Sequence, residues 1–331
     1  MSNHQSLEDI IARKAAVGSV ALFDKAILNP EQAGKFIREI IEEQVILKEA
    51  SVVTMRSHTK NLDRVAIDGR ILHSGYTAAG ATRAVDAAGW DTFQNQLVAQ
   101  KLKTQAEIED DALEDNIEGK AFANTLLELI SGQIGYDMEV WSLFGDTTIN
   151  FSTDDLLSTT DGFLKKSGQN VYDVDIATDG VEKLFDDMIE ALPKKYIKNR
   201  GMLRFYVPYD YEKAYRDVLK ERGTPLGDTN ITGYGQLAYE GIPVVHVPAL
   251  DDATAQALLG AGETPAIDVK PAMLSDPANL VFGIFRQIGV EPARDAEKEL
   301  TKYVVTMRGD VHFTNELANV AAYPQLEEPE G

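Results

Sequence analysis

Residues 51–108 read SVVTMRSHTKNLDRVAIDGRILHSGYTAAGATRAVDAAGWDTFQNQLVAQKLKTQAEI, and no other stretch constrains the architecture as strongly. Apolar residues within 52–67 predict one strand, and those within 93–102 predict its antiparallel return. Small residues fill the connection at 75–89. An isolated two-stranded ribbon is marginally stable in water, and its open edges favour pairing with other chains. We therefore expect residues 51–108 to lie on a neighbouring subunit, which points to assembly rather than catalysis.

The composition is that of an ordinary folded protein with a strongly acidic balance. The 331 residues are 44% hydrophobic and carry a net charge of -21, from 32 basic and 53 acidic residues. Such a chain can bury a core in two or three domains, and it repels phosphates, so it is a poor generic binder of DNA, RNA or anionic membrane. The absence of cysteine excludes disulfides and thiolate metal sites.

Membrane insertion and export are also disfavoured by the sequence. No apolar run reaches the length needed to span a bilayer. Glu8 and Asp9 stand where a signal peptide would carry positive charge. We therefore expect a protein of a cytoplasmic compartment.

Two helices are expected on either side of the ribbon. Asn29 can cap the first, Pro30 suits its first position, and an apolar stripe then runs to residue 50. The second helix begins near Asp110 and reaches residue 144, and seven acids lie among the twelve residues 107–118. Carboxylates at a helix N-terminus are stabilising. Three glycines, Gly119, Gly132 and Gly135, predict a kink or break in this helix.

The rest of the chain is mixed α/β and then β. Between residues 147 and 271 we expect a helix at 181–192, a strand at 202–207, a helix capped by Asp210, a loop at 223–235 and a strand at 243–247. Between 279 and 323 we expect antiparallel strands at 280–285, 303–307 and 311–322.

Residue types that carry chemistry are scattered rather than clustered. The five histidines lie at no zinc-binding spacing, and His246 and His312 are expected to be hydrogen-bonded structural residues in strands. Gly233-Tyr234-Gly235 is no dinucleotide fingerprint and predicts a flexible loop. We find no Walker A sequence and no nucleophile elbow. We therefore predict no catalytic, cofactor-binding or metal site.

Paired acids recur along the chain at 110–111, 154–155, 186–187 and 251–252. Acid–base catalysis needs two carboxylates in a shaped cleft, so the first pair is better interpreted as part of a helix start, and the others as capping or solvated residues. The acids at 107–118 could also bind a divalent cation between subunits, a minor alternative because EF-hand spacing is missing.

The order of these segments resembles the major capsid proteins of tailed bacteriophages, which have the Hong-Kong-97-type fold. The resembling segments are the helix at 30–50 followed by the ribbon, AEIEDDALEDN (106–116), MLRFYVP (202–208), EGIPVVHVPAL (240–250), NLVFGIFRQIG (279–289) and RGDVHF (308–313). The likeness spans nearly the whole chain and rests on the order of the segments, because the family has no diagnostic short motif.

The resemblance implies an α+β chain in five parts. These are an N-terminal arm with the first helix (1–50), an extended β-ribbon loop (51–108), a peripheral domain with a long spine helix (109–150), an axial α/β domain at the centre of each pentamer or hexamer (151–275), and a return to the peripheral domain that ends in an acidic tail (276–331).

The resemblance also implies partners. Pentamers and hexamers would close into an icosahedral head shell that encloses double-stranded DNA without sequence-specific binding. A portal protein and a separate scaffold protein are expected, since residues 1–28 are too short for a fused scaffold, and a decoration protein is an option. The protein would be assembled in the host cytoplasm, would reside in the virion, and would use neither membrane nor cofactor.

The residues expected at the assembly contacts lie mainly on the ribbon. The expected inter-subunit residues are Arg56, Lys60, Arg64, Trp90 and Phe93, with the three cations meeting acidic surfaces of the adjacent subunit. The spine-helix start at Asp110, Asp111 and Glu114 and the axial loop at Gly233, Tyr234 and Gly235 complete the set. Some relatives form a Lys–Asn isopeptide cross-link from this loop, but no motif around Lys60 supports that chemistry, and we predict none.

Two alternatives stay open at the level of sequence. One is an encapsulin-like compartment shell that encloses an enzyme cargo. The other is a soluble acidic α/β hydrolase, for which the sequence offers no nucleophile–base set.

Overall fold

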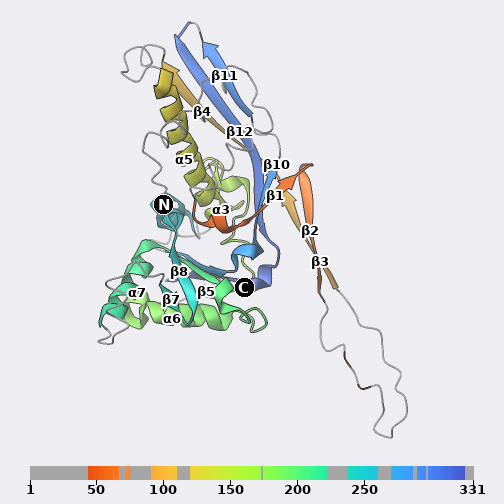
Figure 1. Ribbon diagram of the computed structural model, residues 1–331, viewed down its shortest axis with the longest axis vertical. Helices are drawn as coiled ribbons and strands as arrows, with labels where there is room; N and C mark the ends of the chain where they lie inside the picture. Colours follow the sequence, from red (N-terminus) through yellow and green to blue (C-terminus); the bar gives the residue numbers. More distant parts are fainter. Residues whose placement is uncertain are drawn as a thin grey trace, which may run out of the picture.

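The computed structural model describes residues 44–66, 72, 74, 91–109, 120–172, 174–221, 237–259, 270–285, 289–295 and 297–324. A long helix packs along long strands in one part of the molecule, a second sheet with two helices forms another, and a two-stranded ribbon projects to the side (Figure 1).

The helices are α3 (Ile46–Glu49), α5 (Lys120–Phe144), α6 (Ile176–Ala191), α7 (Tyr209–Glu221) and α9 (Ala253–Leu258). The strands are β1 (Ser51–Met55), β2 (Thr59–Ala66), β3 (Asp91–Val98), β4 (Gln100–Glu109), β5 (Asn170–Tyr172), β6 (Arg204–Val207), β7 (Ala238–Tyr239), β8 (Ile242–His246), β9 (Ala272–Ser275), β10 (Leu280–Phe285), β11 (Gly289–Asp295), β12 (Leu300–Phe313) and β13 (Asn319–Tyr323). Short 3-10 turns are η2 (Leu157–Thr159), η3 (Arg200–Met202), η4 (Pro248–Asp251), η5 (Pro277–Asn279) and η6 (Glu316–Ala318).

The long-strand sheet has the order β1-β10-β12-β11, and β4 also pairs with β12. β1 runs parallel to β10, and the other pairs are antiparallel. Helix α5 contributes Trp141 to a core that also holds Phe282 of β10 and Phe313 of β12, and all three side chains are fully buried. Burial of large aromatic side chains of this kind supplies much of the stability of a core.

The six-stranded sheet has the order β5-β13-β9-β6-β8-β7. Helices α6 and α7 pack on it, and their aromatic residues meet those of the strands: the rings of Phe185 and Phe205 lie 4.6 Å apart, and those of Phe185 and Tyr215 lie 5.6 Å apart. The last strand, β13, belongs to this sheet and is buried between β5 and β9. Residues 276–331, expected together in the peripheral domain, are therefore divided between both sheets.

Several predicted elements are confirmed, and some boundaries are wrong. The helix at 181–192 corresponds to α6, and the strand at 243–247 corresponds to β8. The break expected between 307 and 311 does not occur, because β12 continues through Gly309. A Cβ at that position would lie 3.0 Å from the carbonyl oxygen of Gly283, so this glycine permits close strand approach rather than a turn.

Two helix predictions are also corrected. α5 is helical throughout 120–144, including Gly132 and Gly135, because the packing of its apolar side offsets the low helix propensity of glycine. Asp210 lies inside the first turn of α7 rather than at its cap. Both carboxylate oxygens of Asp251 accept from the Tyr209 N–H, at 3.0 and 3.1 Å, so a residue from η4 caps this helix.

Within the described parts of the chain, no helix is long and apolar enough to cross a membrane.

Candidate assembly surface

The predicted ribbon is divided into parts with different partners. The single strand expected at 52–67 is two strands, β1 and β2, and the return strand is β3 and β4. β1 pairs with β10, and β4 pairs with β12 of the same chain. Among the described strands of this segment, only β2 and β3 pair solely with each other, from Thr59 opposite Val98 to Ala66 opposite Asp91. The expectation that all of 51–108 leaves its own subunit is therefore wrong for both ends of this segment.

The root of the ribbon has a small core of its own. Met55, Leu97, Ala99 and Val281 are buried together there. A Cβ on Gly283 would lie 2.9 Å from Leu97 Cδ1 and 3.0 Å from Met55 Sδ, so the glycine leaves room for both side chains on β10. The ribbon is thus seated on the long-strand sheet by apolar packing.

Asp310 of β12 fixes the direction in which the ribbon leaves the sheet. Its carboxylate is only 3% exposed, and Oδ2 accepts from the Val98 N–H at 2.7 Å. Oδ1 accepts from Thr160 Oγ1 at 2.8 Å and lies 3.4 Å from Lys166 Nζ. Next to it, Asn95 Nδ2 donates to the carbonyl oxygen of Phe313 at 2.8 Å. Two residues of β3 are therefore tied to β12 through polar contacts.

Alternation along the strands gives the ribbon two different faces. One face carries Arg64, whose guanidinium lies 4.8 Å from the centroid of the Phe93 ring directly across the ribbon. Arg64 on this face also lies near Tyr196, which packs against the core of the six-stranded sheet. This face therefore turns toward the chain's own six-stranded unit. Burial would raise the pKa of Tyr196, but hydrogen bonds from Asn315, Arg64 and Lys195 outweigh it and hold the pKa below its usual range.

The other face of the ribbon is exposed and rich in amides. Gln94 Nε2 donates to Asp63 Oδ1 at 2.8 Å, and Gln96 Nε2 donates to Asn61 Oδ1 at 3.2 Å. Val65 belongs to the same face and is 63% exposed. Cross-strand pairs of this kind stabilise a hairpin modestly. Contact of this face with another surface would remove few charged groups from water.

Solved structures with this fold come from phage-like particles. A chain of the satellite phage P4 procapsid including size determination (Sid) protein matches with a TM-score of 0.63, over 98% of this chain and 99% of that chain, at 13% identity. A chain from the capsid of an empty GTA particle matches with a TM-score of 0.56, over 86% and 90% of the two chains, at 13% identity. One from Mycobacterium phage Adephagia matches with a TM-score of 0.55, over 86% and 91%, at 13% identity.

A protein that is similar in sequence is also named for a phage capsid. The chain is 28% identical over 306 residues to a Bacillus subtilis (strain 168) protein, YqbE, which is named as a prophage capsid protein; the match spans 92% of this chain and 95% of that protein. No protein-family model matches the chain. The chain thus has the fold of tailed-phage capsid chains and is similar, over nearly its whole length, to a protein named for a prophage capsid. The predicted Hong-Kong-97-type α+β fold is thereby confirmed.

The structure places four of the predicted contact residues of this chain. Arg56 is exposed at the bend between β1 and β2, and Lys60 Nζ lies 3.5 Å from the carbonyl oxygen of Thr54. Arg64 and Phe93 form the stacked pair described above, and Phe93 is 47% exposed. The other predicted residues, Trp90, Asp110, Asp111, Glu114, Gly233, Tyr234 and Gly235, lie outside the described residues. Contact of any of them with a neighbouring subunit stays a prediction.

Two of the paired acids have the capping role expected of them. Asp154 Oδ1 accepts from the N–H groups of Leu156 and Leu157, at 2.9 and 2.8 Å. Asp252 Oδ1 caps α9 in the same way and its Oδ2 accepts from Tyr136 Oη of α5 at 3.1 Å, which joins the two parts of the molecule. The prediction of capping is confirmed for these residues.

The two strand histidines are also structural. His246 Nε2 lies 2.8 Å from Asp251 Oδ2, and the ring packs edge-on against Tyr209 at 5.8 Å. His312 Nδ1 accepts from the Phe313 N–H at 2.9 Å. Hydrogen bonds thus account for both residues, as predicted.

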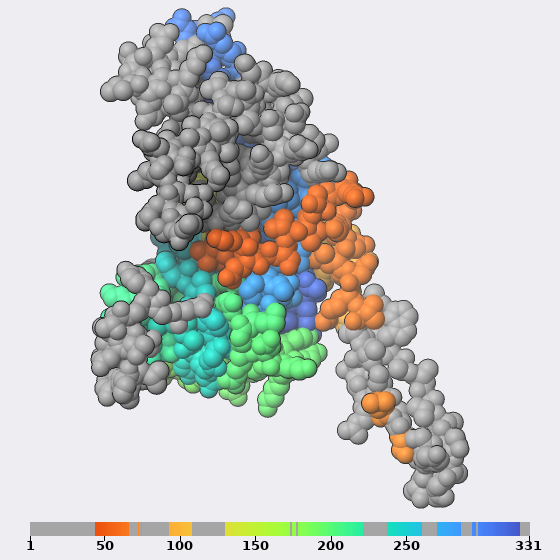
Figure 2. Space-filling view, in the orientation of Figure 1, coloured from red at the N-terminus to blue at the C-terminus, as the bar shows by residue number. Residues whose placement is uncertain are grey.

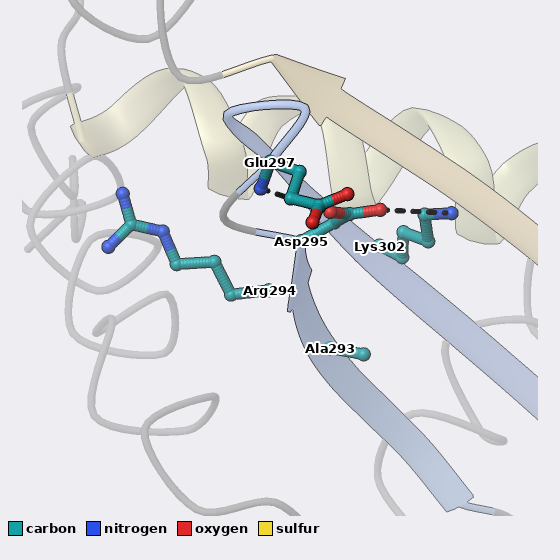
Figure 3. A pocket seen from close by; sticks show the side chains of 5 residues that line it. All are labelled: Ala293, Arg294, Asp295, Glu297 and Lys302. Atoms are coloured by element: carbon teal, nitrogen blue, oxygen red, sulfur yellow. Dashed lines mark hydrogen bonds and ion pairs between the residues drawn. The ribbon is translucent and has the colours of Figure 1, made fainter.

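A hollow of about 340 Å³ lies at the far end of β11 and β12 (Figure 3). It is lined by Ala293, Arg294, Asp295, Glu297 and Lys302. Asp295 accepts from the Glu297 N–H at 3.2 Å and lies 3.9 Å from Lys302 Nζ, so its carboxylate is already engaged. Among the residues that the structure describes, no three His, Asp or Glu side chains gather as a metal site would require.

Proposed function

We propose that this chain is a major capsid protein whose copies form pentamers and hexamers that close into the icosahedral head around double-stranded DNA. The ribbon carries this proposal: its root is fixed to the chain's own sheet, while β2 and β3 project with an exposed amide face (Figures 1 and 2). A short ribbon gains little stability from its own pairing and much from a surface beneath or above it. In a shell, a neighbouring copy of the chain supplies that surface.

Ring formation needs a different kind of contact from ribbon overlap. A closed ring uses heterologous contacts, in which one patch meets a different patch on the next copy. The six-stranded unit presents two unlike edges, β5 at one and β7 at the other, and both edge strands are short. We assign this unit to the centre of each ring and the long-strand sheet to its periphery.

The partners that follow from this assignment are a portal protein, a separate scaffold protein and, as an option, a decoration protein. The net charge of -21 favours loose packing of DNA against the shell, since phosphates would be repelled from most of the surface. The relative in Bacillus subtilis is named for a prophage capsid, which favours a DNA-containing head over a compartment for an enzyme cargo.

Electron microscopy of the purified protein tests the proposal directly. We expect hollow polyhedral particles by negative staining and a rapidly sedimenting species in the ultracentrifuge. A protein that remains a compact monomer or small oligomer over a wide range of concentration and salt would contradict the proposal.

A shortened ribbon sharpens the test. Ala66 and Asp91 face each other across the ribbon, so an Asn-Gly linker that replaces 67–90 would close it with a two-residue hairpin turn. We expect this variant to keep the fold and thermal unfolding midpoint of the wild type, and to lose assembly. Normal shells from the shortened chain would show that the ribbon does not join neighbouring copies.

A further inference from the structure

A cation-rich turn connects α6 to β6. Residues 193–200 read PKKYIKNR, with four cations and no acid, in a chain that has 53 acids against 32 basic residues. Arg200 is paired, since its Nη1 lies 2.6 Å from Glu240 Oε2. Lys194 and Lys198 are exposed and have no ion-pair partner among the residues that the structure describes. We name Lys194, Lys195 and Lys198 the turn patch.

The turn patch is continuous with the ribbon. Tyr196 lies between the lysines, partly buried against the six-stranded core. Lys195 of the turn and Arg64 of β2 both lie near enough to its hydroxyl to lower its pKa, and the Lys195 ammonium lies 5.0 Å from the centroid of its ring. Cations from two elements are therefore held beside one another, where the ribbon meets the six-stranded unit.

We propose that the turn patch, together with Arg64, binds an acidic surface on a second copy of this chain. The proposal rests on the proposed function and names a contact within it. Among the described residues no carboxylate pairs with Lys194 or Lys198, in spite of the excess of acids in the chain, so their charges are available to another molecule. A second copy supplies carboxylates such as Asp179, Asp186 and Glu190, which are exposed on α6.

Charge favours a protein partner over nucleic acid. The whole chain is strongly negative, so DNA phosphates approaching the patch would be repelled by most of the surrounding surface. A second copy is subject to the same overall repulsion, but it can bring a local cluster of acids to the lysines in a fixed orientation. Complementary charges at an interface fix register and exclude wrong pairings.

The test compares two double charge reversals in full-length protein. Lys194→Glu with Lys198→Glu alters the patch. Lys213→Glu with Lys220→Glu changes the net charge by the same amount on α7, where both lysines are exposed. The fraction of protein in particles is measured by sedimentation velocity at about 150 mM salt, where charges are screened over roughly 8 Å. Thermal unfolding midpoints verify that every variant is folded.

We expect the patch variant to lose at least about tenfold in particle fraction, because like charges facing each other across an interface are strongly unfavourable. The α7 variant should stay within about twofold of the wild type. A milder double variant, Lys194→Gln with Lys198→Gln, should lose an intermediate part of the particle fraction. It keeps the test usable if the charge-reversal variant fails to fold.

Other results overturn the inference. If both double-reversal variants assembled like the wild type, the turn patch would not be part of the interface between copies. Equal losses in the two would assign the effect to net charge alone. If the wild type itself formed no particles, the proposed function would fail instead, so the two failures are distinguishable.

Discussion

Asp310 has a buried carboxylate in the long-strand sheet that links the ribbon to the segment around Thr160. One oxygen accepts from the Val98 N–H and the other from Thr160 Oγ1, with the Lys166 ammonium nearby. A buried carboxylate is tolerated only where such partners replace its water. The residue therefore couples the direction of β3 to the position of β12.

Asp310→Asn should weaken this coupling. We expect the free energy of unfolding to fall by about 2–3 kcal/mol, because loss of one charge leaves its partly buried partner uncompensated. Hydrogen exchange at the Val98 amide should accelerate. Urea unfolding of the unassembled protein gives the first quantity, and exchange gives the second. Asp155→Asn, at an exposed position, should stay within about 0.5 kcal/mol; equal effects in both variants would contradict this role for Asp310.

His312 adds a dependence on pH. Burial lowers its pKa, and the charge of Lys166 lowers it further, while Glu316, the Phe313 backbone and Asp310 act in the opposite sense. Since the folded pKa lies below that of the unfolded chain, about 6.5, the unfolded state takes up the proton first as the pH falls. Stability is therefore lost as the pH decreases below that value.

The matching measurement is unfolding free energy between about pH 7 and pH 5 in the wild type and in His312→Gln. We expect the wild-type curve to fall more steeply, with the difference growing as the pH decreases. His58→Gln, at an exposed position, controls for the loss of a histidine. Parallel curves for the wild type and His312→Gln would refute the assignment.

For single residues, the sequence predicts well the roles that depend on neighbours close along the chain. The pairs at 154–155 and 251–252 were expected to be capping or solvated acids, and Asp154 and Asp252 do cap, because capping depends on amides two or three residues away. Asp310 was not expected, because its partner Val98 is 212 residues distant and their contact follows from the register of β12 with the ribbon root. An acid within the apolar run of 303–313 is the one signal that could have drawn attention to it.

Among the elements, α3 and α5 are joined by an unusual cap. Glu139 of α5 is 1% exposed, and its Oε1 accepts from the Ile46 N–H of α3 at 2.5 Å. Burial raises the pKa of Glu139, partly offset by the N–H groups of Ile46, Leu47 and Val45. The first N–H groups of a helix have no partner within it, so a side chain of a different helix satisfies them here.

Glu139→Ala should leave those N–H groups buried without an acceptor. We expect a loss of about 1–3 kcal/mol in unfolding free energy and faster hydrogen exchange at Ile46. Glu139→Gln keeps one acceptor oxygen and should lose less than half as much. The same loss in both variants would mean that the charge, rather than the acceptor, holds α3 in place.

Elements with strong periodicity could be predicted from sequence, whereas their partners could not. The apolar stripe of α6 and the apolar run of β8 identify those elements directly. The ribbon was also found, but its division into four strands was not, because Met55 and Leu97 become buried only when β10, far along the chain, packs against them. The two faces of β2 and β3 were likewise hidden, since both carry polar residues in the sequence.

For the whole molecule, charge is the property most open to experiment. A net charge of -21 on each copy makes neighbouring copies repel. The screening length falls from about 30 Å at 0.01 M salt to about 8 Å at 0.15 M. We expect the yield of particles to rise between these two salt concentrations, as measured by sedimentation at constant protein concentration. Equal yields at both would contradict this expectation.

Strand β12 carries a mechanical consequence for a filled shell. Its 14 residues form hydrogen bonds with β4 and β11 toward one end and with β10 toward the other, beside the root of the ribbon. In the proposed shell, a pull on the ribbon would reach β12 through the bond between Val98 and Asp310, and any component along the strand would load the hydrogen bonds of β12 in shear. Backbone hydrogen bonds loaded in that direction must shear together rather than open one after another. We therefore expect a subunit of the proposed shell to resist stretching along β12 better than peeling of its strands.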